Sequence, residues 1–578
     1  MSADPSASPS ARHVIKLVAD LLRPETGYLG LAVIYGIGIS VLSLATPIAV
    51  QVLINSVGFT GLAVPLVVLS LTLFGLLLAS GLLNAMRVHL MEIFARRFYA
   101  RLTSAIALKA LYAQKPFFQD DGRSVLFNRY FDILNVVKAL PILLIGGFTV
   151  LLQAAVGFIL TSFYHPLFLA FNVVVIALIW LIWLVWGGGA IKTAVKLSQE
   201  KHETAAWLQS LAGSNGYFKS HEHIAYALKR TDQETNDYVM AHRRHFRRHF
   251  SQTIGFLLLY ATASAALLGL GGWLVIQGQL TLGQLVAAEL VLSVAFYGVS
   301  QLGSYLNYFY DLCAAAEELS LLDGIVLEEP TGEEVPDLPH GSLVFDAVKG
   351  HARGAPAVFD VEIPAGQIVY ARAQSHGVQR LFTNLLKRFE SPKGGTLTLG
   401  GYDITSIEVL TLRRFVIVLD RPTVVEMSIR NYLTLAREEA TSAEMLDTLA
   451  CVGLDEVMEE LEDGLDTQLS VTGWPLSVSE TMRLKLAAAI LARPKVLILN
   501  QLFDTLPSAF LQRAVDRLCV TCDEPTTLII FSSAEPQMHF DRYLCIGAQK
   551  QTISDDPAIL GMRSAMTKLE PVRAVEDA

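Results

Sequence analysis

Six apolar runs, each long enough to cross a bilayer, are the feature that most constrains the fold of this chain. A transmembrane helix needs about 20 consecutive, mostly apolar residues, and such runs occupy residues 28–54, 62–86, 139–163, 166–190, 252–277 and 282–310. The composition agrees, because 52% of the residues are hydrophobic and only 17% are charged, against about 25% in a soluble domain. The sequence therefore predicts a multi-pass membrane protein with six spans.

The charge of the joins between these runs predicts their sides of the membrane. The joins at 55–61, 164–165 and 278–281 are short and contain neither Lys nor Arg, whereas the joins after the second and fourth runs are long and rich in both. Because positively charged loops stay in the cytosol, both long joins and both termini are expected inside. The long joins are also rich in helix formers, so they predict cytosolic helical extensions with tips near 115–116 and 213–216.

Changes in composition divide the chain into further segments. Residues 1–27 are rich in Ser, Ala and Pro and predict a cytosolic tail, residues 28–321 form the transmembrane domain, and the acidic, Pro-containing segment 322–338 is typical of a linker. Residues 339–556 alternate short β-like runs with helix-like stretches, which predicts a sheet flanked by helices, and 557–578 are expected to be a C-terminal tail. The β-like runs are 342–345, 367–370, 396–399, 415–419, 496–499, 527–530 and 543–546.

Net charge and cysteine usage exclude some classes of partner. The net charge of −9 leaves no general basic surface for phosphates, so no nucleic-acid partner is expected. Cys519 and Cys522 have CxxC spacing, but no second pair or His cluster completes a four-ligand zinc site. Ordinary thiols and no metal site are the prediction, and membrane lipid is the expected surrounding.

Four short segments, in this order, carry a resemblance to a known family. Residues 117–124 (Phe-Phe-Gln-Asp-Asp-Gly-Arg-Ser) resemble the first cytosolic coupling segment of ATP-binding cassette (ABC) exporters, and 278–287 resemble the entry to their sixth helix. Residues 391–404 resemble the strand and turn after the first helix of the cytosolic domain, and 463–467 the approach to the signature motif. The chain thus resembles an ABC exporter half-transporter, most like the type I secretion and bacteriocin-export branches.

The resemblance implies a fold, a location and partners. The implied fold is a six-helix, all-α exporter transmembrane domain followed by an α/β domain like the P-loop ATPases. The implied setting is a bacterial-type inner membrane, as a homodimer or heterodimer with another half-transporter, and such exporters can also engage a periplasmic adaptor. The coupling segments implied at the two cytosolic tips contain Phe117, Phe118, Gly122 and Arg123 in one and Gly216 and Tyr217 in the other.

The phosphate-binding loop of that family does not match here. A P-loop reads GxxxxGK[ST], because glycines let backbone N–H groups wrap the phosphates, the Lys reaches the β and γ oxygens, and the hydroxyl holds Mg²⁺. At these places the chain has Ala373, Gln374, Ser375, His376, Gly377, Val378, Gln379 and Arg380. Gln379 replaces the Lys and Arg380 replaces the hydroxyl, so the loop predicts loss of phosphate and metal binding.

At the other positions that the family uses for ATP hydrolysis, the residues also differ from the family's motifs. The two Walker B carboxylates correspond to the amides Asn500 and Gln501, the Q-loop glutamine to Asp420, and the switch histidine to Ser532. The signature LSGGQ is replaced by Leu476, Ser477, Val478, Ser479 and Glu480, where Val478 adds bulk at a place of close backbone approach. The resemblance therefore implies a degenerate nucleotide-binding domain without catalytic residues, in which Mg·ATP binds weakly or only through a partner subunit.

Three functions are compatible with this sequence. The first is a transport subunit that pairs with an ATPase-competent half, and the second is a membrane scaffold or regulatory pseudo-ATPase that transports nothing. The third, an active ATP-driven homodimer, conflicts with the residues at both parts of the nucleotide site. Whether the chain is an enzyme stays open, with no catalysis expected from it alone.

Glu289 is the one acidic residue that the sequence places inside a predicted span. An ionisable group at membrane depth is by default a functional hypothesis. The alternative is that Glu289 lies near enough to the outer surface to be hydrated. Both interpretations stay open at this stage.

The topology leads to a labelling prediction. Cysteines introduced at Gly58 and Gly278 should react with an impermeant thiol reagent added to intact cells, because both lie in joins without positive charge. A cysteine at Gly216 should react only after the cells are opened. The reverse pattern would contradict the topology.

Overall fold

A computed structural model describes residues 10–60, 63–114, 118, 123–328, 331–335, 337–521, 525–536 and 538–562. The chain forms two compact units, Met1–Leu327 and Glu328–Ala578. The division falls inside segment 322–338, where the sequence predicts a linker.

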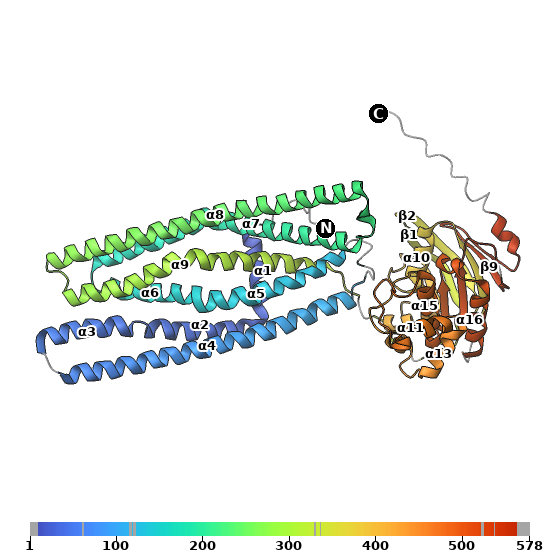
Figure 1. Ribbon diagram of the computed structural model, residues 1–578, viewed down its shortest axis with the longest axis horizontal. Coiled ribbons are helices and arrows are strands. Elements are labelled where there is room, and N and C mark those ends of the chain that lie inside the picture. Colours follow the sequence, from blue (N-terminus) through green and yellow to red (C-terminus); the bar gives the residue numbers. More distant parts are fainter. Residues whose placement is uncertain are drawn as a thin grey trace, which may run out of the picture. The chain divides into compact units, whose positions relative to one another are not determined.

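The first unit consists of helices (Figure 1). Six of its helical segments are long and apolar enough to cross a membrane, and each predicted run overlaps one of them, so the six predicted spans are confirmed. The α-helices are α1 (Ala11–Leu22), α2 (Thr26–Leu42), α3 (Ala45–Thr60), α4 (Ala63–Leu111), α5 (Tyr130–Ile142), α6 (Phe148–Ser162), α7 (Pro166–Gly213), α8 (His221–Ile276) and α9 (Leu282–Ser320). Short helical turns are η1 (Arg23–Glu25), η2 (Arg123–Arg129), η3 (Leu143–Gly147), η4 (Tyr217–Lys219) and η5 (Leu321–Gly324).

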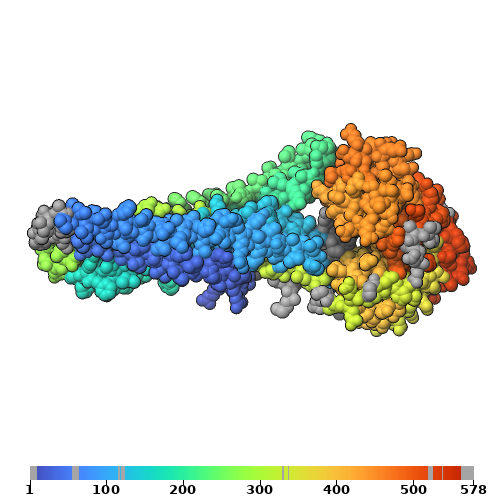
Figure 2. All heavy atoms as spheres, turned by 90° about the horizontal axis from the view of Figure 1, so that it is seen from below, coloured from blue at the N-terminus to red at the C-terminus, as the bar shows by residue number. Residues whose placement is uncertain are grey.

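The predicted tail over 1–27 was wrong in one respect, because α1 lies within it. Ser10 caps this helix by accepting a hydrogen bond from the His13 N–H at 3.2 Å. Val14 and Val18 lie on one face and are buried, in the same apolar cluster as residues of α4 and α9. The apolar positions of α1 are too few to cross a membrane, but their helical spacing buries one face against the bundle. Figure 2 shows this dark blue segment projecting from the side of the bundle.

The first and third spans are interrupted helices. The first breaks at Ser43–Leu44 into α2 and α3, and it ends at Ile54 as a candidate span, as predicted. Helix α3 continues to Thr60, so most of the predicted join at 55–61 is helical. In the third, the five-residue π-helix η3 lies between α5 and α6. The guanidinium of Arg87, only 2% exposed, donates to the carbonyl of Ile145 in η3 at 3.2 Å. A π segment leaves carbonyl groups without their usual helical partners, and Arg87 satisfies one of them.

The long helices extend well beyond a bilayer. Helix α7 has 48 residues, or about 72 Å at 1.5 Å per residue, whereas a bilayer with its headgroups is about 40–45 Å thick. Near its carboxyl end, His202 and Lys201 contact the buried Asp132 of α5 at 2.6 and 3.0 Å. The buried Asp132 carboxylate is tolerated there because the Lys201 ammonium is a partner of opposite charge.

The second unit contains two sheets. The four-stranded sheet has the order β2-β1-β4-β5, and the six-stranded sheet has the order β10-β9-β3-β8-β7-β6, in which all pairs except β10 with β9 are parallel. The strands are β1 (Leu343–Ala352), β2 (Ala355–Ile363), β3 (Ile368–Ala373), β4 (Thr396–Leu399), β5 (Tyr402–Asp403), β6 (Val416–Leu419), β7 (Val496–Leu499), β8 (Thr527–Phe531), β9 (Arg542–Ile546) and β10 (Gln551–Ser554). All seven predicted strands are present, and β2, β5 and β10 were not predicted.

Helices and apolar clusters cover the faces of the six-stranded sheet (Figure 1). One cluster joins the sheet to α10, β1 and β2, and the other joins it to α12, α13, α15 and α16. The helices are α10 (His376–Leu386), α11 (Val409–Phe415), α12 (Ile429–Ala436), α13 (Ser442–Cys451), α14 (Asp455–Glu460), α15 (Val478–Ala492) and α16 (Ser508–Thr521), with turns η6 (Gly464–Asp466), η7 (Gln501–Thr505) and η8 (Pro557–Met562). The central strands β7 and β8 are buried throughout, as expected for a parallel sheet covered on both faces.

Close packing at η3 leads to a stability prediction. A Cβ atom on Gly146 would lie 2.6 Å from the Tyr305 hydroxyl of α9, whereas one on Gly188 of α7 would meet no atom within 4 Å. Gly146→Ala should therefore cost about 1–3 kcal/mol of stability and lower the melting temperature of the detergent-purified chain. Gly188→Ala is the matched control and should leave that temperature unchanged or raise it; equal effects would contradict the packing.

Candidate functional site

The segment between β3 and α10 occupies the place of the predicted P-loop. Only Gln374 and Ser375 lie between the end of β3 and the start of α10 at His376. The Gln374 N–H donates to the Ile546 carbonyl at 2.8 Å, and its side-chain oxygen accepts from the Ala548 N–H at 3.0 Å. The Val378 and Gln379 N–H groups donate to the Ser375 carbonyl at 3.1 and 3.2 Å. These backbone donors are thus satisfied within the protein.

Two amides are paired where the resemblance places a lysine and a catalytic carboxylate. The Gln501 side-chain N–H donates to the Gln379 side-chain oxygen at 2.8 Å. Gln379 is 4% exposed, and Gln501 lies at the start of η7, after β7. The tertiary structure therefore brings together two residues far apart in the sequence, and the pair carries no net charge.

Asn500 and Ser532 serve the local backbone. The Asn500 side chain accepts from the Leu502 N–H at 3.1 Å, which caps η7, and donates to the Asp420 carbonyl at 2.9 Å. The Ser532 hydroxyl accepts from the Ala534 N–H at 3.1 Å. Both side chains are buried, so both predicted site residues lie at this edge of the sheet in structural roles.

Asp420 lies at the carboxyl end of β6 and is exposed. The nearby Lys485 ammonium donates to the carbonyls of Arg421 and Thr423 at 2.8 and 2.9 Å. Burial lowers the pKa of Lys485, and the negative charge of Asp420 partly opposes that effect. The Lys485 ammonium is thus occupied by backbone carbonyls.

The signature positions form the start of α15. Ser477 is the N-cap, and it forms a capping box with Glu480: the Glu480 N–H donates to the Ser477 hydroxyl at 3.3 Å, and the Ser477 N–H donates to the Glu480 carboxylate at 2.8 Å. A carboxylate in the first turn already occupies the favourable positive end of the helix dipole. Leu476 is buried, Ser479 is half-buried, and the Val478 side chain is exposed, at 59%.

Arg353 is a residue of this region that the sequence analysis missed. It lies in the β1–β2 turn with a φ of 50°, and a Cβ atom on the buried Gly377 would be 2.9 Å from its side-chain Cγ. The Arg353 stem therefore lies against the first turn of α10, beside the exposed residues His376 and Arg380. The Arg-Gly pair after a β-like run could have indicated the turn, but not the contact with Gly377.

Comparison with known proteins decides the family of the first unit. Residues 29–299 match the family model described as ABC transporter transmembrane region. The chain is similar to a bacterial Atm1-family ABC exporter with ATP bound, with a TM-score of 0.75, over 96% of this chain and 99% of that one, at 18% identity. The first unit thus has the fold of an ABC exporter transmembrane domain. An α/β domain follows it, and the whole has the ABC exporter fold.

Several curated proteins are similar to parts of this chain. An uncharacterized ABC transporter ATP-binding protein of Bacillus subtilis, YknU, is 30% identical over 41% of this chain. The alpha-hemolysin translocation ATP-binding protein HlyB of Escherichia coli O157:H7 is 23% identical over 48% of this chain, in agreement with the resemblance to type I secretion exporters. These matches cover 42% and 40% of the two relatives, so they span less than half of either protein.

The predicted coupling segments of this exporter fold are described only in part. Phe117 and Gly122 lie outside the described residues, while the Phe118 ring packs edge-on against Phe127, with centroids 4.8 Å apart, and Arg123 begins η2. At the other tip, Gly216 lies in the turn after α7, and the exposed Tyr217 ring stacks on His223 at 4.6 Å. The predicted break at 213–216 is confirmed.

Glu289 lies on α9, two turns from its start. One carboxylate oxygen accepts from the Ser293 hydroxyl at 3.1 Å, and the other is buried without a hydrogen-bond partner in the described part of the chain. The residue is half-buried. This geometry fits neither full hydration of the Glu289 carboxylate nor a complete polar network around it. A functional role of Glu289 therefore stays a prediction.

The amide pair leads to a double-mutant prediction. Gln501→Leu leaves the Gln379 amide buried without a partner and should cost about 1–3 kcal/mol, whereas Gln379→Met with Gln501→Leu removes both polar groups and should recover most of that loss. The stability of the single and the double variant is measured by calorimetric melting of the full chain in detergent. Gln512→Leu, which removes an exposed bond to Asp516, is the control and should change stability by less than about 0.5 kcal/mol. A double variant less stable than the single one would contradict the pairing.

Proposed function

We propose that this chain is a subunit of an ABC-type exporter whose own nucleotide site is degenerate, and that it pairs with a second half carrying intact motifs. The observation that carries the proposal is the hydrogen bond between Gln379 and Gln501. It occupies the positions where an active exporter subunit needs a lysine for the phosphates and a carboxylate for the attacking water.

The chemistry of these side chains does not fit Mg²⁺·ATP. Neutral amides at Gln379, Asn500 and Gln501 supply neither charge to the phosphates nor an anionic ligand to the metal. Removing one preorganised electrostatic donor from an active site costs about 2.7–4 kcal/mol of transition-state stabilisation. Several such groups are replaced together here, which supports negligible turnover by this chain's own site.

The apolar framework supports a retained role for the domain in assembly. Its central strands β7 and β8 are buried throughout, and Asn500 and Ser532 are bonded to local backbone. The proposed setting is a bacterial-type inner membrane with both termini in the cytosol, which the charge of the joins supports. In an assembled exporter the domain would meet the cytosolic tips or a second half-transporter.

A scaffold that transports nothing is the second candidate. The capping box of Ser477 with Glu480 and the exposed side chain of Val478 favour it, because a partner's nucleotide would meet a carboxylate and a bulky side chain where the signature motif normally closes. The two candidates differ in whether any ATP turnover accompanies the assembled complex.

Purification of the chain with its natural partner tests both candidates. The isolated chain should hydrolyse no ATP above background. A co-purified second half with intact motifs should give ATPase activity that is lost when the partner's P-loop lysine is replaced and is unchanged by Gln501→Ala here.

The other outcomes of this purification favour the scaffold or contradict both candidates. A complex without a competent half and without turnover would favour the scaffold. Mg²⁺-dependent turnover by the isolated chain, lost in Gln501→Ala, would contradict both candidates.

A further inference from the structure

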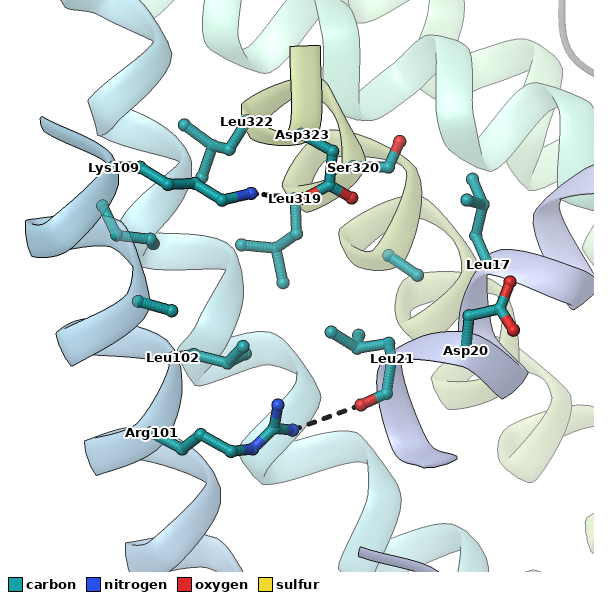
Figure 3. A pocket seen from close by; sticks show the side chains of 13 residues that line it. Leu17, Asp20, Leu21, Arg101, Leu102, Lys109, Leu319, Ser320, Leu322 and Asp323 are labelled. Atoms are coloured by element: carbon teal, nitrogen blue, oxygen red, sulfur yellow. Dashed lines mark hydrogen bonds and ion pairs between the residues drawn. The ribbon is translucent and has the colours of Figure 1, made fainter. Parts of the chain in front are cut away.

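A pocket of about 300 Å³ lies between α1, α4 and the end of α9 with η5, all within the first unit (Figure 3). This volume is at the lower end of the range of small-molecule sites, about 300–1,000 Å³. None of the nucleotide-site residues lines it. The pocket is therefore separate from the site discussed above.

One side of the pocket is an apolar wall. Leu17 and Leu21 come from α1, Leu102 and Ile106 from α4, and Leu319 and Leu322 from α9 and η5. These six side chains are contributed by elements from both ends of the unit's sequence. Such a wall suits an aliphatic chain better than a polar metabolite, because each buried CH₂ contributes about 0.8 kcal/mol.

Arg101 gives one end of the pocket an excess of positive charge. Its Nε donates to Glu25 at 3.2 Å and its Nη2 to the Leu21 carbonyl at 3.2 Å, while its Nη1 has no hydrogen-bond partner among the described residues. Glu25 is only 1% exposed and also contacts Arg97 at 3.3 Å. Two guanidinium groups thus share a single carboxylate.

The remaining charged groups do not cancel that excess where it lies. At the other end of the pocket, Lys109 and Asp323 form an ion pair and neutralise each other. Asp20 is exposed on the rim, and Figure 3 shows its carboxylate directed away from the Arg101 guanidinium. An anionic group is therefore favoured at the Arg101 end.

The pocket lies on the side of the long helical extensions. The charged part of α4 begins at Arg87, and Arg101 to Lys109 follow about 20–35 Å further along the helix at 1.5 Å per residue. Glu25, which Arg101 contacts, comes only three residues before the first predicted span at residue 28, so the Arg101 end lies close to the headgroup layer. Asp323 at the other end of the pocket is exposed.

We propose that this pocket binds a single-chain amphiphile with an anionic head group, whose head contacts Arg101 and whose chain lies along the leucine-lined wall. The bound molecule would join α1 to α4 and α9, and would therefore hold the helix that precedes the first span against the bundle. This inference goes beyond the proposed function and does not depend on ATP turnover or on a partner subunit.

Calorimetric titration of the full chain in lipid nanodiscs tests the proposal, with decanoate as the probe and decanol and decyltrimethylammonium as comparisons. Decanoate should bind saturably at one site, at least tenfold more tightly than either comparison. Ala105→Phe fills the pocket and Arg101→Gln removes the charge, so each should weaken decanoate binding at least tenfold. Ala107→Phe and Arg96→Gln, exposed on the same helix, are the matched controls and should stay within twofold of the wild type.

A second readout follows α1 itself. Decanoate should slow hydrogen exchange of residues 11–22 in the wild type but not in Ala105→Phe. If anionic lipid in the nanodisc gives the same protection without decanoate, the amphiphile comes from the membrane rather than from free solution. Equal binding of decanol and decanoate, no saturable binding, or binding unaffected by Ala105→Phe would overturn the proposal.

Discussion

The first unit depends on one constraint: hydrocarbon offers no partner to a backbone N–H or C=O group, so every such group must be bonded within the protein. Long uninterrupted helices meet this requirement by themselves. Where a helix departs from regular geometry, another residue must compensate, and the contact of Arg87 with the Ile145 carbonyl of η3 is an example. The buried arginine is thus explained by the irregular helix beside it.

Outside the bilayer the same helices are held together by a different chemistry. Asp132 of α5 with Lys201 of α7, and Arg129 of η2 with Glu318 of α9, pair charges between these elements, each at 3.0 Å. Removal of one partner would leave an uncompensated buried charge, so such pairs specify how the extensions align. The extensions are therefore distinct from the spans in what stabilises them, although they belong to the same helices.

In the second unit, the polar residues at the predicted nucleotide site have structural roles within an apolar framework. Asn500 caps a helical turn, Ser477 and Glu480 cap a helix, and Gln379 bonds Gln501. Polar residues at the ends of parallel strands need partners once they are buried. When no ligand has to be held, neighbouring backbone groups and amides can supply those partners, which explains how the fold can persist with different site residues.

The sequence by itself determined the six spans and the strands of the buried sheet, because hydrophobic runs are local patterns. The loss of the nucleotide site, which rests on motif spacing, stays a prediction. It did not indicate that α1 packs on the bundle, that α3 reaches Thr60, or that β2, β5 and β10 exist. Short or amphipathic segments acquire their structure from neighbours distant in sequence. Only the tertiary structure paired Gln379 with Gln501 and placed Arg101, Leu17 and Leu319 around one pocket, since contacts between distant segments depend on how the helices and strands pack.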